Sequence, residues 1–154
     1  MTELPLPVIE KTVHKTRLWL DDVMAATETM DRTRAFRALR AVLHALRDNL
    51  SVEEIARFGA QMPLLVRGLY YEGWTPGGAK DDTVADFVGR VAAEFGDFPT
   101  LDLETVCRGV YRVVGQFVSA GEMRDVSAAL PPAVRAFLEA DVYRAPGEPL
   151  IAAP

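Results

Sequence analysis

The chain of 154 residues has little of the material from which catalytic and metal sites are built, since it contains one cysteine and two histidines. The single cysteine, Cys107, cannot form a disulfide within the chain or supply a cysteine-based zinc cluster. The sequence also lacks the basic start and apolar run of a secretory signal peptide. We therefore expect a domain that works in the reducing cytoplasm.

Long apolar runs and an excess of basic residues are also missing. No stretch approaches the roughly 18 consecutive apolar residues that a membrane-spanning helix needs. Seventeen Lys and Arg stand against 22 Asp and Glu, which gives a formal net charge of -5. This balance disfavours nucleic acid as a partner, because proteins of that class carry a basic footprint. The 49% hydrophobic and 25% charged residues indicate instead one folded globular domain.

Motifs that carry common chemistries are absent. No G-x-G-x-x-G, H-E-x-x-H or G-x-S-x-G occurs in the chain. Glu10 and His14 lie one helical turn apart, but a bound metal ion would need further ligands, so we interpret them as a solvated pair. The glycine-containing segment that ends at Lys80 lacks the Ser or Thr that follows the lysine of a Walker loop. We therefore predict no catalytic residue, no cofactor and no metal.

Apolar periodicity and proline positions predict an all-α fold. Residues 8–62 contain no proline, and apolar residues recur there at steps of three and four, which is typical of helices. The pattern predicts a first helix over 8–27 and a second helix capped by Asp31. Ser51 and Glu54 have the spacing of a capping box, in which each side chain satisfies a backbone amide at the start of a third helix.

A fourth helix is expected between Pro63 and Gly73, because proline suits the first turn of a helix and glycine suits its end. The segment from Trp74 to Lys80 contains Pro76 and two glycines and is interpreted as a linker. The first half of the chain is thus predicted to form a unit of four helices.

The second half repeats the first at an offset of 68 residues. When 17–70 is compared with 85–138, ten of the 54 positions are identical, against about three or four expected by composition. Both capping boxes and both helix-opening prolines, Pro63 and Pro131, fall in register. We therefore predict a single domain over 1–154, a helical bundle of two pseudo-repeats packed around a pseudo-twofold axis. The first repeat covers about 8–74, the second about 81–143, and a loose C-terminal tail covers 144–154.

Two segments carry a resemblance to a known family. They read ALRAVLHALRDNLSVEEIARFGAQMPLLVRGLYYEGW at 38–74 and GEMRDVSAALPPAVRAFL at 121–138. Each has a glutamate-containing capping turn followed by Met-Pro or Leu-Pro, and the chain resembles the bacterial family DUF2267 over about 10–143. The resemblance implies an all-helical cytoplasmic domain and transfers no catalytic residue. Met62 stands where the family more often has leucine, which is a change in packing only.

A basic stripe is the first candidate contact surface. Arg37, Arg40, His44 and Arg47 are spaced three, four and three residues apart, on the side of the second helix opposite its leucines. We expect His44 to be a surface histidine within this stripe. The stripe fits an acidic partner, and the alternative interpretation is a solvated face that makes weak ion pairs.

An aromatic cluster beside an arginine is the second candidate surface. Arg67, Tyr70, Tyr71 and Trp74 gather at the end of the fourth helix. Tyr, Trp and Arg anchor many protein interfaces. The same rings would also suit the packing of a helix end into the groove between the repeats. Both interpretations stay open.

The leading hypothesis is a non-catalytic interaction or regulatory module. Its partner would be another protein or a second copy of the chain in a homodimer. The first alternative is a small-molecule-binding protein, in which the groove between the repeats holds an apolar or acidic ligand against Tyr71, Trp74 and Arg67. The second is a metal-dependent enzyme that uses Glu10, His14 or His44. Cys107 lies on an apolar helical stripe and is expected to be an inert core residue.

Overall fold

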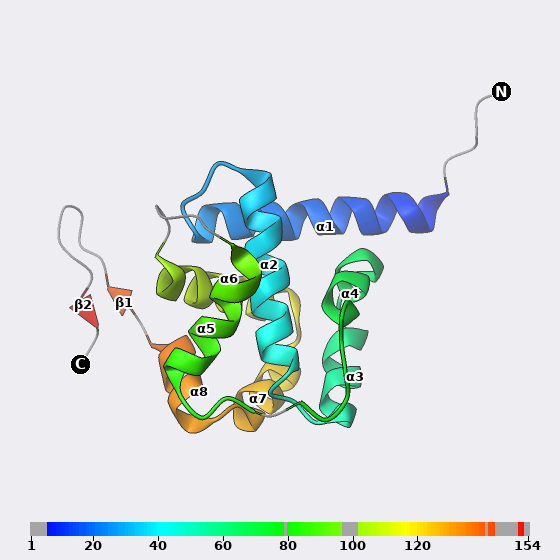
Figure 1. Ribbon diagram of the computed structural model, residues 1–154. Coiled ribbons are helices and arrows are strands. Elements are labelled where there is room, and N and C mark those ends of the chain that lie inside the picture. The colour runs from blue at the N-terminus through cyan, green and yellow to red at the C-terminus, as the bar shows by residue number, and fades with distance from the viewer. Residues whose placement is uncertain (1–5, 79, 97–101, 141, 144–150, 153–154) are drawn as a thin grey trace.

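The computed structural model describes residues 6–78, 80–96, 102–140, 142–143 and 151–152, and Figure 1 shows that helices make up almost all of them. The all-α prediction is confirmed. The helices are α1 (Pro7–Ala26), α2 (Arg32–Arg47), α3 (Val52–Ala60), α4 (Leu64–Tyr71), α5 (Val84–Phe95), α6 (Leu103–Phe117), α7 (Ala120–Ala129) and α8 (Pro132–Glu139). Two short strands, β1 (Val142–Tyr143) and β2 (Ile151–Ala152), pair in antiparallel orientation.

Helix starts follow the capping residues that the sequence predicts. Asp31 accepts a hydrogen bond from the Thr33 amide at 2.9 Å at the start of α2. At the start of α3, the Glu54 amide donates to Ser51 Oγ at 3.3 Å and the Ser51 amide donates to Glu54 Oε2 at 2.9 Å. Both predictions are confirmed, because side-chain oxygens satisfy amides that have no partner within the helix.

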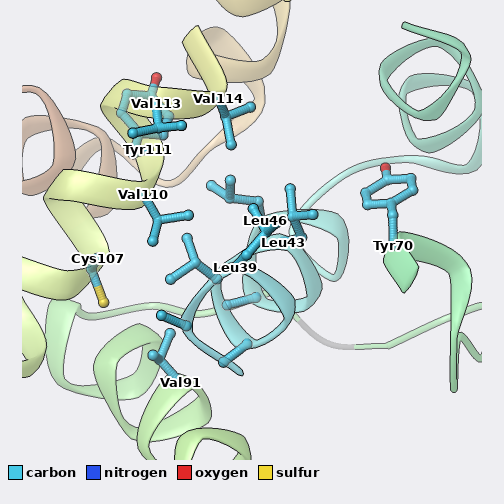
Figure 2. Packing of buried hydrophobic residues seen from close by; sticks show 14 of the residues in the cluster. Leu39, Leu43, Leu46, Tyr70, Val91, Cys107, Val110, Tyr111, Val113 and Val114 are labelled. Carbon is cyan, nitrogen blue, oxygen red and sulfur yellow. The ribbon is translucent and has the colours of Figure 1, made fainter. Parts of the chain in front are cut away.

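The core is built around α2, which contacts α1, α4, α5 and α6. Figure 2 shows Leu39, Leu43 and Leu46 of α2 directed toward side chains of α5 and α6, among them Val91 and Val110. Every residue of α2 from 41 to 47 is buried. The second half of α2 is therefore covered on all sides, as is typical of a central helix of a bundle, and this position decides the environment of its polar residues.

The first helix of each half packs on the second helix of the other half, since α1 contacts α6 and α5 contacts α2. Trp19 of α1 stacks on Phe117 of α6, with ring centroids 4.9 Å apart and an interplanar angle of 13°. Gly109 lets α6 approach α1 closely, because a Cβ atom there would lie 2.9 Å from the Ala26 carbonyl oxygen. The two halves therefore share one core.

The N-terminal part of α1 projects past the other helices, as Figure 1 shows. Ile9 lies on the same helical stripe as buried Thr16 and Val23 but is 55% exposed, because the stripe continues beyond the bundle. None of the described helices combines the length and apolarity needed to cross a membrane. Most of the predicted loose tail, 144–154, lies outside the described residues, and within it Ile151–Ala152 forms a strand.

Candidate functional site

The structure places the basic stripe of α2 in two different environments. Arg37 is exposed, and half-buried Arg40 donates from Nη2 to Glu72 Oε1 at 2.8 Å. His44 and Arg47 are only 3% and 4% exposed, so the prediction of a surface stripe is wrong for both. The physical reason is that Glu94 of α5 and backbone carbonyls at the end of α4 contact these two side chains.

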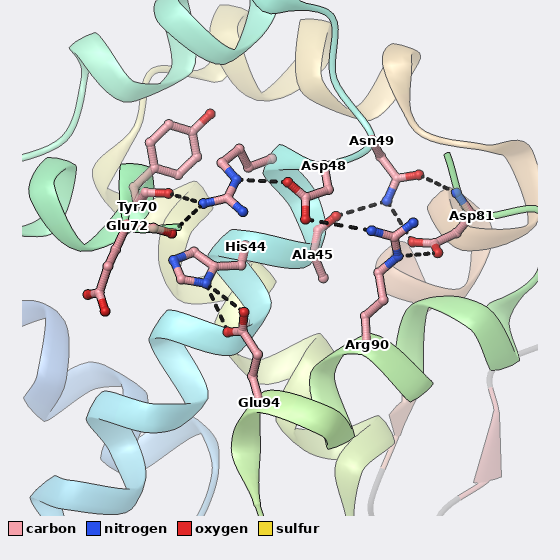
Figure 3. A network of polar contacts seen from close by, with 10 residues as sticks. His44, Ala45, Asp48, Asn49, Tyr70, Glu72, Asp81, Arg90 and Glu94 are labelled. Carbon is pink, nitrogen blue, oxygen red and sulfur yellow. Dashed lines mark hydrogen bonds and ion pairs between the residues drawn. The ribbon is translucent and has the colours of Figure 1, made fainter. Parts of the chain in front are cut away.

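His44 is held from two sides, and Figure 3 shows its contact with Glu94. Its Nδ1 lies 2.8 Å and 2.9 Å from the two carboxylate oxygens of Glu94, and its Nε2 lies 2.8 Å from the Leu69 carbonyl oxygen. Carboxylates and carbonyls accept hydrogen bonds, so both contacts are satisfied together when each ring nitrogen carries a hydrogen. Since both nitrogens are engaged, the geometry gives no support to His44 as a general base or metal ligand.

Arg47 donates hydrogen bonds to backbone carbonyls at the C-terminal end of α4. Its Nη1 donates to the carbonyl oxygens of Tyr70 and Glu72 at 2.8 Å and 2.9 Å, and its Nε donates to Asp48 Oδ1 at 2.8 Å. The last carbonyls of a helix have no partner within the helix, and a cation there meets the negative end of the helix dipole. The Arg47 guanidinium is therefore a structural group within the fold.

The linker between α4 and α5 is fastened to α2 by a second polar group (Figure 3). The Asp81 amide donates to Asn49 Oδ1 at 2.9 Å, and Asn49 Nδ2 donates to Asp81 Oδ2 at 2.8 Å. Arg90 of α5 adds a hydrogen bond from Nε to Asp81 Oδ1 at 2.6 Å. In the sequence Asp81 is only one of two adjacent acids, and its partner Asn49 lies 32 positions away. Local sequence patterns carry no signal for such a contact.

Arg67 stabilises the end of α3 in the same manner. It donates to the carbonyl oxygens of Gly59, Ala60 and Met62, at 2.9 Å, 3.2 Å and 3.1 Å. These bonds satisfy carbonyl oxygens at a helix end. The Arg67 guanidinium, which the sequence predicts as part of a contact surface, thus holds α3 and α4 together.

The aromatic cluster divides between core and surface. Tyr70 is buried, its hydroxyl donates to the Ile55 carbonyl oxygen at 3.0 Å, and burial raises the pKa of this hydroxyl above its ordinary value. Tyr71 and Trp74 are half-buried and meet edge to face, with ring centroids 6.1 Å apart. The hollow beside Trp74 has a volume of about 170 Å³, smaller than the roughly 300 Å³ at which small-molecule pockets begin. This place gives the small-molecule alternative no support.

Cys107 is buried, as predicted. Burial, with a smaller contribution from Glu104, raises the pKa of its thiol to about 12. Since the thiolate is the reactive form, we expect iodoacetamide at pH 8 to label native protein at least about a hundred-fold more slowly than urea-unfolded protein. Mass spectrometry of timed samples measures both rates. Equal rates in the two states would contradict the buried position.

An exposed apolar surface, which the sequence analysis did not predict, lies where α1 crosses the start of α4. The Leu65 amide of α4 donates to Thr12 Oγ1 of α1 at 2.9 Å, so the two helices touch there. Large apolar side chains that are 42–57% exposed occur on α1, at the start of α4 and near the start of α2. We call this set the α1–α4 surface, and it comprises Val8, Ile9, Leu18, Phe36, Leu64 and Leu65.

Two hollows flank this crossing. One has a volume of about 510 Å³ and is lined by Leu18 and Leu64 with Lys15 and Arg67. The other has a volume of about 310 Å³ and is lined by Phe36 and Leu65. The sequence does contain a signal for this surface. Leu64 and Leu65 are adjacent, and neighbouring residues on a helix point in directions about 100° apart, so it is difficult for one packed side of the helix to bury both.

Within the described part of the chain, no group of three or more His, Cys, Asp or Glu side chains is arranged to hold a metal ion. Glu10 and His14 are both exposed on α1. The structure therefore brings the predicted polar residues together mainly as helix-end contacts, and it leaves the α1–α4 surface open.

Comparison with protein families gives one match. A family model described as "Uncharacterized conserved protein (DUF2267)" matches residues 16–137. The match runs from the middle of α1 into α8, so it covers both halves of the bundle. None of the curated proteins compared with the chain matches it.

Proposed function

The chain belongs to the DUF2267 family, and from this premise we propose that it is a non-catalytic interaction module that binds a partner protein through the α1–α4 surface. The observation that carries the proposal is that Leu64 and Leu65 are exposed where α4 contacts α1, each beside a hollow that is also lined by an apolar side chain of another helix, Leu18 or Phe36. Contiguous exposed apolar side chains in a folded protein commonly mark an interaction site. We place the module in a bacterial cytoplasm, in accord with its single free thiol.

The partner that fits this surface is an amphipathic helix with acidic flanks. The hollows beside α1 can receive apolar side chains of a helix, a mode of recognition that recurs among helical proteins. Residues 7–18 of α1 carry Lys11, Lys15 and Arg17 against a single acid, Glu10. These positive charges would attract acidic residues on the flanks of the bound helix and speed the encounter.

We further propose that the bundle consists of two related four-helix units, α1–α4 and α5–α8. Three observations support this. The first residues of α7 and α8 lie 68 positions after the first residues of α3 and α4. The contact of α1 with α6 has a counterpart in the contact of α5 with α2. The residues after α1 and α5 that have positive φ, Glu28 and Gly96, also lie 68 positions apart.

A binding experiment with a matched surface control tests the proposed function. The full chain is immobilised, retained proteins are identified by mass spectrometry, and each is purified and titrated against the full chain. We expect Leu65→Glu to weaken the binding of the true partner at least about ten-fold, because a charge replaces an apolar contact at the centre of the surface. Val52→Glu is the control, since Val52 is 57% exposed on α3, outside the surface, and Glu is favourable in a first helical turn.

The outcome that supports the proposal is a partner whose binding segment is helical and acidic and whose affinity falls with Leu65→Glu alone. If the wild-type chain forms a dimer that dissociates with Leu65→Glu, the partner at this surface is a second copy of this chain and not another protein. Equal binding by wild type and Leu65→Glu, or no retained protein at all, would contradict the proposal.

A further inference from the structure

A larger cavity lies apart from the α1–α4 surface, between α6, α7 and α8. Its volume is about 800 Å³, and it is open to solvent. The volume falls within the roughly 300–1,000 Å³ of small-molecule sites. Gly115 on α6, Met123 on α7 and Leu138 on α8 line it with apolar surface.

The same place in the first half of the chain is filled. There Arg47 reaches from α2 to the end of α4, and the rings of Tyr70 and Tyr71 pack at the surface of Gly59 of α3. The residues 68 positions after Arg47, Tyr70 and Tyr71 are all smaller, and each lines the cavity: Gly115, Leu138 and Glu139. The cavity is thus the room left by one guanidinium side chain and two rings.

Three arginines surround the cavity. Arg112 comes from α6, Arg124 from α7 and Arg135 from α8. Within the part of the chain that the structure describes, none of the three lies within 4.0 Å of a carboxylate oxygen. Arg67, which lies 68 positions before Arg135, instead donates hydrogen bonds to carbonyl oxygens at the end of α3. The lining of the cavity therefore combines three arginine side chains with apolar ones.

One carboxylate also lines the cavity, and it is already held by neighbours. Glu139 Oε1 accepts hydrogen bonds from the Tyr111 hydroxyl at 3.3 Å and from the Ser127 hydroxyl. Burial and the nearby Glu139 charge raise the pKa of Tyr111, so this hydroxyl stays protonated and continues to donate. With three arginines and one such carboxylate, the charge of the lining is positive.

We propose that this cavity binds a small organic anion with an apolar body. The anionic group would be held by Arg112, Arg124 and Arg135, because guanidinium groups bind carboxylates with charge-assisted hydrogen bonds. The apolar body would lie against Met123 and Leu138 and fill the room left by Gly115. This site is independent of the partner-binding surface, because the two share no lining residue.

Calorimetric titration of the full chain with matched probes tests the ligand class. The probes are octanoate, octylammonium and inorganic phosphate. We expect octanoate to bind at least about ten-fold more tightly than octylammonium, which has the same tail and the opposite charge. We also expect it to bind at least about ten-fold more tightly than inorganic phosphate, which lacks an apolar body. Equal affinity for octanoate and octylammonium, or no binding of octanoate at millimolar concentration, would overturn the proposal.

Two variants tie the binding to the cavity. Gly115→Leu fills it, and a Cβ at Gly115 meets only Met123, at 3.8 Å, so the fold has room for the side chain. We expect octanoate affinity to fall at least about ten-fold in Gly115→Leu and to stay unchanged in Gly89→Leu, which adds the same side chain at an open position of α5. Arg124→Gln with Arg135→Gln should remove the preference for the anion. Unchanged octanoate binding in both cavity variants would also overturn the proposal.

Discussion

Replacement of Arg47 by methionine is expected to lower the free energy of unfolding by about 3–5 kcal/mol. Methionine keeps much of the apolar volume but removes every donor, so the carbonyls of Tyr70 and Glu72 lose the Arg47 hydrogen bonds and the Asp48 carboxylate keeps only its ion pair with Arg90. Removing one member of a buried ionic group is costly because the others stay desolvated. Since a domain of this kind has about 5–15 kcal/mol in all, the loss would be a large fraction of its stability.

Urea unfolding followed by circular dichroism measures this effect. Arg37→Met is the matched control, because Arg37 is an exposed arginine of the same helix. We expect the control to change the free energy of unfolding by no more than about 0.5 kcal/mol, as is usual for surface substitutions. A loss in Arg47→Met no larger than that of the control would show that the contacts of Arg47 at the end of α4 contribute little.

Trp19→Ala is the second substitution for which we expect a large effect, about 3–5 kcal/mol. Trp19 is 1% exposed and stacks on Phe117, so it joins α1 to α6. Its removal loses the burial of a large ring and leaves a cavity between the two halves of the chain. The same urea unfolding assay measures the loss.

Leu18→Ala provides the comparison for Trp19→Ala. Leu18 precedes Trp19 on the same helix but is 43% exposed. We expect Leu18→Ala to lower the free energy of unfolding by less than about 1 kcal/mol, because folding removes only part of the Leu18 side chain from water. If the two substitutions had equal effects, the stacked contact of Trp19 with Phe117 would not be a main link between α1 and α6.

Helix starts could be predicted from the sequence because their determinants are local. Asp31, Ser51 and Pro63 act on backbone groups within three or four residues of themselves, so spacing alone is sufficient. Cys107 could likewise be placed in the core, because it continues the apolar stripe of its own helix. Predictions that depend on one helix at a time were therefore reliable.

The environments of His44 and Arg47 could not be predicted in this way. Periodicity shows which side of α2 carries leucines, but it does not show that α5 and the end of α4 also contact His44 and Arg47. The partners of His44 lie far away in the chain, with Glu94 50 positions and Leu69 25 positions from it. A polar stripe on a central helix has the same local pattern as a solvated one.

The exposure of Ile9 could not be predicted from periodicity either. Its apolar stripe continues through Thr16 and Val23, and the pattern does not reveal where the neighbouring helices end. The cavity between α6, α7 and α8 depends in turn on a comparison of positions 68 apart. The sequence shows that Gly115 stands 68 positions after Arg47. Only the structure shows that the Arg47 side chain reaches the end of α4, and hence that a glycine at the corresponding position leaves a cavity.

The packing of α1 on α6 and of α5 on α2 has a consequence for synthesis on the ribosome. When the first four helices leave the exit tunnel, Trp19 still lacks the ring of Phe117, and the leucines of α2 still lack α5. Contacts between distant parts of a chain form late. The nascent protein must therefore keep apolar surface exposed until translation has passed α6, and chaperones that act during elongation would meet its first half before its second half can cover it.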